Sequence, residues 1–219
     1  MIINKYSADD PNFGTIITTL GNEIGKDGKP ADQDLLGNSI PDVLPILPVR
    51  GMVVYPLTAV PLTVGQPRSV SLIDDVSNDD RIIGLVTSKN PDIETPGPDE
   101  LYRIGTAAAV HRLMKTPDGT IRLLVQGIAR IRIGDYIDTQ PYLKAQVELH
   151  PETREKGIKI EALVRTTVKQ FENLAHLVPS IPDEMIPTAL NIDDPRQLAY
   201  AIATYLRIDL KLAQKLLEI

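Results

Sequence analysis

The pattern of apolar and polar positions divides the chain into three parts. Residues 1–42 show little periodicity and many glycines and prolines, so they bury too little apolar surface to offset the entropy of ordering. Residues 43–151 contain short apolar, β-branched runs separated by turn residues, which predict strands. In residues 152–219 the apolar period changes from two to about 3.6, which predicts helices. We therefore expect a flexible leader, a β-rich part and a helical part.

The β-rich part is expected to form a small barrel. Its clearest signal is the turn Pro117-Asp118-Gly119-Thr120, which joins a strand over 107–115 to a long strand over 121–133. Gly127 inside the long strand predicts a bulge or bend that curls the sheet. Further short strands are expected over 43–49, 52–56, 59–65, 81–87 and 142–149, with one helix over 66–78. Prolines in 43–49 favour an edge or barrel-closing strand.

The helical part is expected to form a bundle beside the barrel. Apolar residues from Ile160 to Val178 fall on one helical stripe. Capping patterns at Ser180 and Asp194 predict two further helices, and Asp209 begins a last one. The chain ends within this apolar pattern, so we expect a longer parent protein. The expected fold class is therefore α+β, a six-stranded pseudobarrel with one helix followed by a helical bundle.

Composition and charge exclude several classes of function. The chain has no cysteine, which removes disulfides, thiolate nucleophiles and sulfur-bound zinc. No stretch approaches the roughly 20 apolar residues of a membrane helix. The net charge of -6, two Phe and no Trp argue against nucleic acid and anionic membrane as general partners. The N-terminus does not resemble a targeting segment, which favours the cytoplasm.

A search for catalytic and metal-binding motifs finds none. His111, His150 and His176 are separated in sequence and lack ligands at metal-binding spacing. The acidic pairs at 74–75, 79–80 and 193–194 lie near helix ends or loops, where capping is the simpler role. A group of arginines could form a basic stripe, although a solvated face or internal pairing is favoured: Arg103, Arg112, Arg122, Arg130 and Arg132. We expect no catalytic residue, metal or cofactor in this chain.

Apolar residues at the barrel edge are the remaining candidates for function. Val60, Pro61 and Leu62 lie on a strand that a proline interrupts, and Leu113 and Met114 precede the hairpin turn. Methionine is flexible and adapts to varied apolar partners. An exposed patch of these five residues would suit loose binding of unfolded polypeptide. The alternative, that they complete the core, stays open.

Several runs of the sequence stand out together: Leu44-Pro45-Ile46-Leu47-Pro48-Val49-Arg50-Gly51-Met52-Val53-Val54-Tyr55-Pro56, Val60–Gly65, Gly105–Val110, Met114–Thr120 and Val125–Arg130, with Ile181–Glu184 and Asp193–Ala199 in the helical part. These runs resemble the N-terminal domain of bacterial Lon ATP-dependent proteases of the LonA type. The resemblance covers roughly residues 43–219. It departs from the family at Val49, where leucine is usual, and in the length of the leader.

The resemblance implies a PUA-like pseudobarrel over 43–151 and a helical bundle over 152–219, before an ATPase module. It also implies a non-catalytic role: capture of unfolded, damaged or degron-bearing proteins and support of a homohexamer. ATP, Mg and the Ser-Lys dyad of a serine protease would belong to the rest of the parent. The alternatives are a free-standing binding module with this barrel alone or an RNA-binding module.

Overall fold

A computed structural model of the chain describes residues 40–77, 81–153, 157–175, 177, 192, 194–206 and 208–219. The described residues fall into two compact units. The first contains those of 38–152 together with 209–219, and the second contains those of 153–208.

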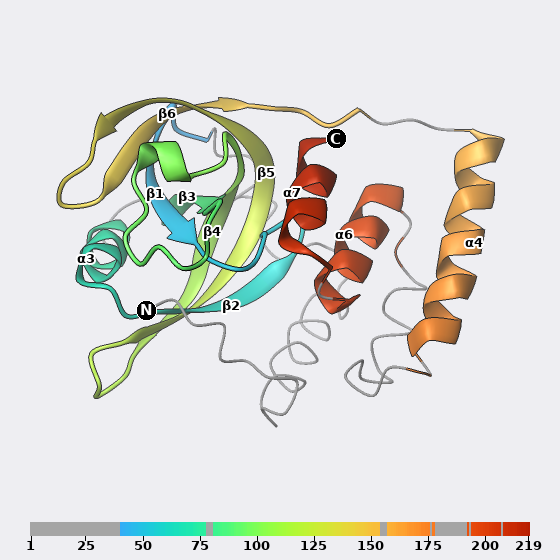
Figure 1. The fold of residues 1–219 in the computed structure, drawn as a ribbon, viewed down its shortest axis with the longest axis horizontal. Coiled ribbons are helices and arrows are strands. Elements are labelled where there is room, and N and C mark those ends of the chain that lie inside the picture. The colour runs from blue at the N-terminus through green and yellow to red at the C-terminus, as the bar shows by residue number, and fades with distance from the viewer. Residues whose placement is uncertain are drawn as a thin grey trace. The chain divides into compact units, whose positions relative to one another are not determined.

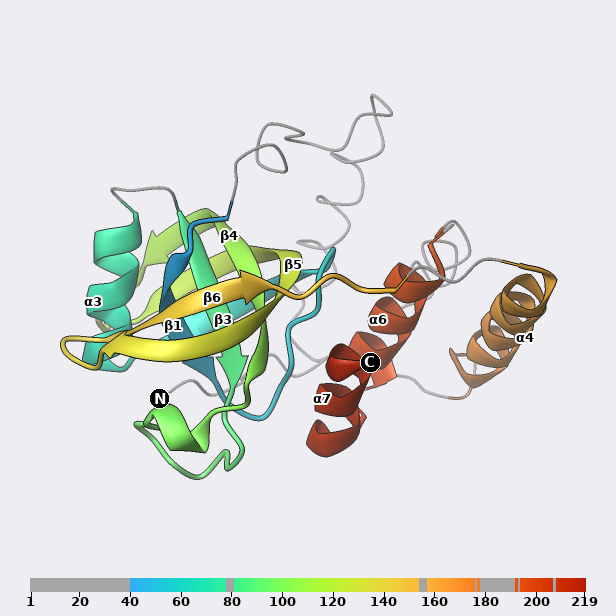
Figure 2. The ribbon, with the colours of Figure 1, turned by 90° about the horizontal axis from the view of Figure 1, so that it is seen from above.

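Six strands of the first unit form one sheet in the order β2-β5-β4-β3-β1-β6. A further pairing of β5 with β6 closes the sheet into a barrel, whereas β2 pairs only with the first part of β5 (Figures 1 and 2). The strands are β1 (Val43–Val49), β2 (Ala59–Val64), β3 (Ile82–Thr87), β4 (Ile104–Lys115), β5 (Ile121–Asp138) and β6 (Leu143–Leu149). The predicted α+β class with a six-stranded sheet is confirmed.

Strand β1 shows how two prolines fit into a barrel. Residues 43–46 pair with β6 and residues 46–49 pair with β3, in parallel. Only Ile46 has pairing partners on both sides, so Pro45 and Pro48 each lie where one side of the strand is unpaired. A residue without an N–H is tolerated at such positions. Of the two predicted roles, β1 therefore has the barrel-closing one.

The segment between β1 and β2 is irregular, although a strand was expected over 52–56. Its carbonyl groups accept hydrogen bonds from side chains instead of a neighbouring strand. Thr106 Oγ1 donates to Val54 O at 2.6 Å, and Thr87 Oγ1 donates to Met52 O at 3.1 Å. The two threonine hydroxyls thus supply hydrogen bonds that a neighbouring strand would otherwise provide to these carbonyl groups. The apolar run over 52–56 is therefore buried without forming a strand.

Gly127 allows this irregular segment to cross β5 closely. Its amide donates to Thr58 O and its carbonyl accepts from Leu57 N, both at 2.9 Å. A Cβ atom at position 127 would lie 2.2 Å from the carbonyl oxygen of Tyr55. The pairing with β4 shifts at this point, because Ala107 lies opposite Ala129 while the next residue lies opposite Gly127. The bulge predicted from Gly127 is therefore present.

Helix α3 (Pro67–Val76) packs on the barrel, with Leu72, Ile73 and Val76 in its core (Figure 2). Proline occupies the first turn of this helix, where its missing N–H costs nothing. A short 3-10 helix, η1 (Pro98–Glu100), lies in the loop between β3 and β4. The predicted helix over 66–78 is confirmed.

The second unit contains α4 (Ile158–Ala175) and α6 (Pro195–Leu206). Phe171 and Ala175 of α4 form a small core with Leu198 of α6. Val164 on the predicted stripe is partly buried against this core, whereas Leu163 is exposed. The helix expected after Ser180 lies outside the described residues.

The last helix, α7 (Leu210–Glu218), contacts the barrel. Asp209 caps its start by accepting from two backbone amides. The hydroxyl of Tyr55 donates to Ala213 O at 3.1 Å, and Gln214 Nε2 donates to Ile104 O at 3.0 Å. Helix α7 thus belongs to the first unit, whereas the expected division placed it with residues 152–219. Periodicity indicates a helix but not the surface that the helix covers.

Arg130 of β5 connects the end of α7 to the end of β6. It is 5% exposed, and its guanidinium donates to Leu217 O at 2.8 Å, His150 O at 2.9 Å and Pro151 O at 3.2 Å. The partial negative charge at the C-terminus of a helix favours a cation in this position. Three carbonyl groups, two after β6 and one near the end of α7, therefore depend on one buried side chain.

The Gly127→Ala substitution is expected to destabilise the fold by about 3 kcal/mol, because the new methyl group would collide with the backbone of Tyr55. Urea unfolding measures this change. Gly134→Ala on the same strand is the control, since its nearest contact would be 3.3 Å, and we expect a loss of about 1 kcal/mol or less. Equal losses for both variants would contradict the close approach at Gly127.

The Arg130→Met substitution is expected to cost about 3 kcal/mol, because it leaves three carbonyl groups without this donor. Hydrogen exchange of the α7 amides should also accelerate more than that of β3. Arg132→Met removes an exposed arginine two residues further along β5 and should change stability by about 0.5 kcal/mol or less. Unchanged exchange in α7 after loss of Arg130 would contradict its role.

Candidate functional site

The five candidate binding residues lie on two opposite faces of the sheet. Val60 and Leu62 are 7% and 3% exposed and belong to the barrel core, and Leu113 packs partly against it. Pro61 alternates with these core residues on β2, and Met114 follows Leu113 on β4 and is 58% exposed. The expected exposure is therefore wrong for Val60 and Leu62, because successive residues of a strand face opposite ways.

Pro61 and Met114 lie on the same outer face of β2, β5 and β4, which we call the hairpin face. The residues of the hairpin face are Pro61, Thr63, Arg112, Met114, Arg122 and Leu124. In the register of the three strands, Met114 lies opposite Arg122, and Arg122 lies opposite Thr63. Apolar and cationic side chains are therefore immediate neighbours on this face.

Sequence reasoning missed Arg122 as a neighbour of Met114. Lys115 and Ile121 are the last pair before the turn, so the next pair outward is Met114 with Arg122. The turn between residues 115 and 121 was recognised, and counting outward from it would have placed Arg122 opposite Met114. The shift in register between Val110 and Arg112 was not visible in the sequence.

The tip of the β4–β5 hairpin projects beyond the barrel, at the lower left of Figure 1. Asp118 orders this tip: its Oδ1 lies 2.5 Å from the hydroxyl of Thr116 and accepts from the hydroxyl and amide of Thr120. The hydrogen bond from Thr116, followed by those from Thr120, lowers the pKa of Asp118 to about 2. The tip therefore carries a fixed negative charge at neutral pH.

Other charged groups near the hairpin have partners. Lys115 Nζ lies 2.7 Å from Asp74 at the end of α3, and the hydroxyl of Tyr142 donates to Asp75 at 2.8 Å. This acidic pair lies in the last turn of α3, where it cannot cap helix amides as the sequence suggested. The two carboxylates are instead held by side chains of β4 and of the loop before β6.

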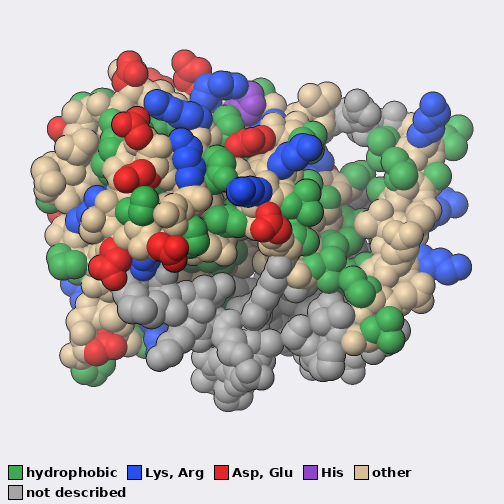
Figure 3. All heavy atoms as spheres, viewed as in Figure 1, with side chains coloured by type: hydrophobic (Ala, Val, Ile, Leu, Met, Phe, Trp, Pro, Cys, Tyr) green, Lys and Arg blue, Asp and Glu red, His purple; other side chains and the backbone are tan. Residues whose placement is uncertain are grey.

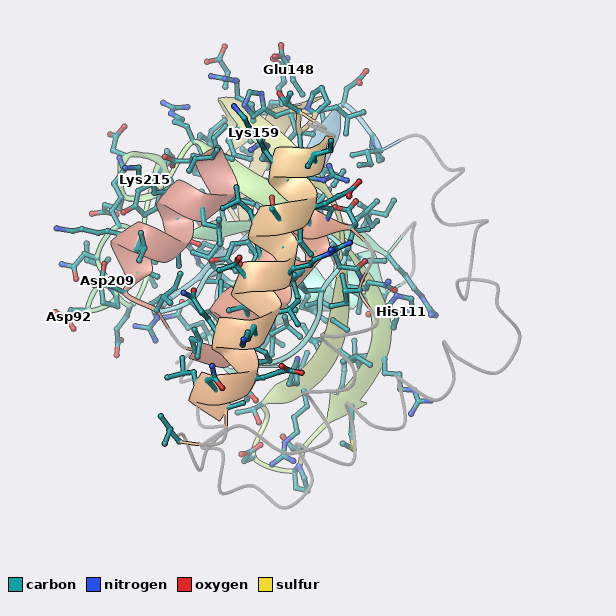
Figure 4. All side chains as sticks on the ribbon, turned by 90° about the vertical axis from the view of Figure 1, so that its right-hand side faces the viewer. Asp92, His111, Glu148, Lys159, Asp209 and Lys215 are labelled. Atoms are coloured by element: carbon teal, nitrogen blue, oxygen red, sulfur yellow. The ribbon has the colours of Figure 1, made fainter. Side chains whose placement is uncertain are left out.

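No described group of three or more His, Asp or Glu side chains could hold a metal ion. Figure 4 shows Asp92, His111 and Glu148 at separate places on the first unit. His111 Nε2 is buried without a hydrogen-bond partner among the described residues, next to the register shift in β4. His176 lies outside the described residues.

The arginines do not form the single basic stripe that was considered. Arg130 is buried, and Arg103 Nη1 donates to Gly134 O at 3.0 Å. On the face shown in Figure 3, acidic and basic side chains alternate over the barrel. None of the described helices is both long enough and apolar enough to pass through a bilayer.

The first unit is a small barrel from which the β4–β5 hairpin projects. The family model for the ATP-dependent protease La (LON) substrate-binding domain matches residues 43–219. The chain therefore belongs to the Lon substrate-binding domain family, as its sequence suggested.

Relatives and a solved structure agree with this assignment. The chain is 42% identical over 179 residues to "Lon protease" of Dictyoglomus thermophilum and 40% identical over 174 residues to that of Brucella melitensis. These alignments cover 82% and 80% of the chain but only 22% and 21% of the relatives. In fold it is similar to the N-terminal domain of Mycobacterium avium complex Lon protease, with a TM-score of 0.58 and 21% identity over 80% of this chain and 89% of that one. The chain spans about a fifth of the length of the Dictyoglomus thermophilum and Brucella melitensis proteins.

The pKa of Asp118 provides a test of the hairpin tip. The folded pKa of about 2 lies below the ordinary 3.8, so the contribution of Asp118 to stability is present above pH 3.8 and is lost as the pH falls through about 2. Thr116→Val should raise this pKa towards 3.8, whereas Thr63→Val on β2 should not move it. Carbon NMR of the Asp118 carboxyl group measures the midpoint, and an unchanged midpoint in Thr116→Val would contradict the hydrogen bond.

Proposed function

We propose that this chain is a non-catalytic substrate-recognition domain that captures unfolded, damaged or degron-bearing proteins for an ATP-dependent protease. In this proposal ATP hydrolysis and peptide cleavage belong to the remaining part of a parent protease in the cytoplasm. The domain would also support assembly of that parent into a hexamer. Membership of the substrate-binding domain family supports the general role.

The exposure of Met114 on the hairpin is the observation that supports a particular binding site. A large apolar side chain that is 58% exposed on a projecting hairpin contributes little to the core. Its flexible thioether packs against apolar side chains of different shapes. Pro61 lies on the same face of the sheet, on β2 opposite Leu124, and adds a second, partly exposed apolar side chain. Binding there needs an accessible apolar segment, which folded proteins mostly bury.

Binding at this face is expected to be weak. It is small and lies on a sheet surface, so it gains little beyond the entropy lost on association. We expect dissociation constants of about 1 μM or weaker for the isolated chain.

The Met114→Asp substitution should weaken binding of a chemically unfolded protein about fivefold, because a charged group replaces the apolar contact. An NMR titration of the labelled chain measures this effect, with the native form of the same protein as a second ligand. Shifts at the hairpin face are expected only with the unfolded form.

Leu149→Asp is the matched control, since Leu149 is 61% exposed on β6 and does not belong to the hairpin face. It should leave binding unchanged, and the melting temperature of both variants verifies folding. Equal binding by wild type and a folded Met114→Asp variant would remove Met114 from the site. Absence of shifts with either form of the ligand would overturn capture by this chain and leave assembly as its proposed role.

A further inference from the structure

The hairpin face combines apolar contact with an available positive charge. Met114 is the exposed apolar residue, and Arg122 lies directly opposite it on β5. Arg122 is itself exposed and forms no ion pair within the described part of the chain. An unpaired guanidinium next to an apolar side chain can recognise both parts of a ligand that carries a carboxylate beside an apolar group.

The charges around Arg122 favour an anionic ligand. Lys115 is already balanced by Asp74 at 2.7 Å. The carboxylate of Asp118 stays negatively charged, but the hydroxyls of Thr116 and Thr120 hold it at the tip. Between residues 111 and 124 the hairpin has three Lys or Arg and one acidic residue, in a chain with a net charge of -6. The hairpin is therefore a locally cationic part of an acidic protein.

The geometry of the face favours an extended ligand. Arg122 is flanked by Met114 on β4 and Thr63 on β2, and Leu124, two residues along β5, is flanked by Arg112 and Pro61. Two neighbouring rows of side chains therefore each contain one exposed arginine. Met114 is the exposed apolar residue of the first row, and Pro61 is the partly exposed one of the second, because Leu124 is only 9% exposed. Alternate side chains of an extended peptide project to one side at a similar spacing.

We propose that the hairpin face selects extended polypeptide segments in which Asp or Glu lies next to apolar residues, and that Arg122 is the residue that makes this selection. This inference rests on the proposed capture of unfolded protein at the same face and adds the chemical class of the segment. An RNA strand is the less suitable anion, because the face lacks aromatic side chains for base stacking and the chain as a whole is acidic.

Three synthetic peptides test the selection, with the same apolar residues flanked by Asp, by Lys or by Ser. Fluorescence anisotropy with the complete chain measures each affinity at low and at physiological salt. We expect the Asp peptide to bind about fivefold more tightly than the Lys peptide at low salt, with a smaller ratio at physiological salt because both partners are exposed.

The Arg122→Glu variant should reverse this preference, and Arg122→Gln should abolish it while the Ser peptide still binds. Arg132→Glu is the matched control: it makes the same charge change on the same strand, away from the hairpin, and should keep the preference for Asp. Melting temperatures and amide spectra verify that all three variants fold.

The possible results separate the two proposals. Equal affinity for the three peptides in the wild type would overturn charge selection and leave capture of apolar segments standing. A preference for Asp that persists in a folded Arg122→Gln variant would assign the selection to other residues. No binding of any peptide, together with no NMR shifts with unfolded protein, would overturn both. Tighter binding of a single-stranded RNA, with a steep dependence on salt, would replace the peptide by RNA as the ligand.

Discussion

The close contact between Gly127 and the backbone of Tyr55 is the constraint on which the rest of this barrel depends. Strand β5 pairs with β2 before the bulge beside Gly127 and with β6 after it, and its pairing with β4 runs along both parts with a shift of register at the bulge. The same segment that crosses Gly127 carries the hydroxyl of Tyr55 to α7. Closure of the barrel and attachment of the last helix therefore depend on one position without a side chain.

The two parts of β5 have different neighbours, and the part before the bulge is the one that contributes to the proposed binding surface. Beyond the bulge, β5 pairs with both β4 and β6 and is also held by the buried contacts of Arg130. Before the bulge it forms the middle of a three-stranded surface whose inner side chains fill the core and whose outer side chains include Met114 and Arg122. A binding surface on such strands is rigid, because the pairing fixes the spacing of its side chains.

The sequence predicted the local features of the fold but not the features that depend on contacts between distant segments. The turn around Asp118, the bulge at Gly127 and the start of α3 follow from properties of single residues and were predictable. The burial of Val60 and Leu62 was not, because it depends on which face of β2 meets the core, and a one-residue change of register reverses every side chain. The location of α7 depends on polar contacts such as Gln214 with Ile104, which leave no periodic signal.

Weak and selective binding are compatible in a surface of this kind. An apolar patch alone would discriminate poorly among unfolded chains, since almost every chain contains exposed apolar segments when it unfolds. A charged residue beside the apolar patch adds discrimination without requiring a deep pocket. It changes the difference in affinity between acidic and basic segments more than it raises the affinity for the acidic segment. If several such domains are joined in one assembly, a long unfolded chain can engage more than one face, and effective concentration raises the overall affinity. In this proposal the hairpin face would select the segment, and an assembly of several such domains would hold the chain.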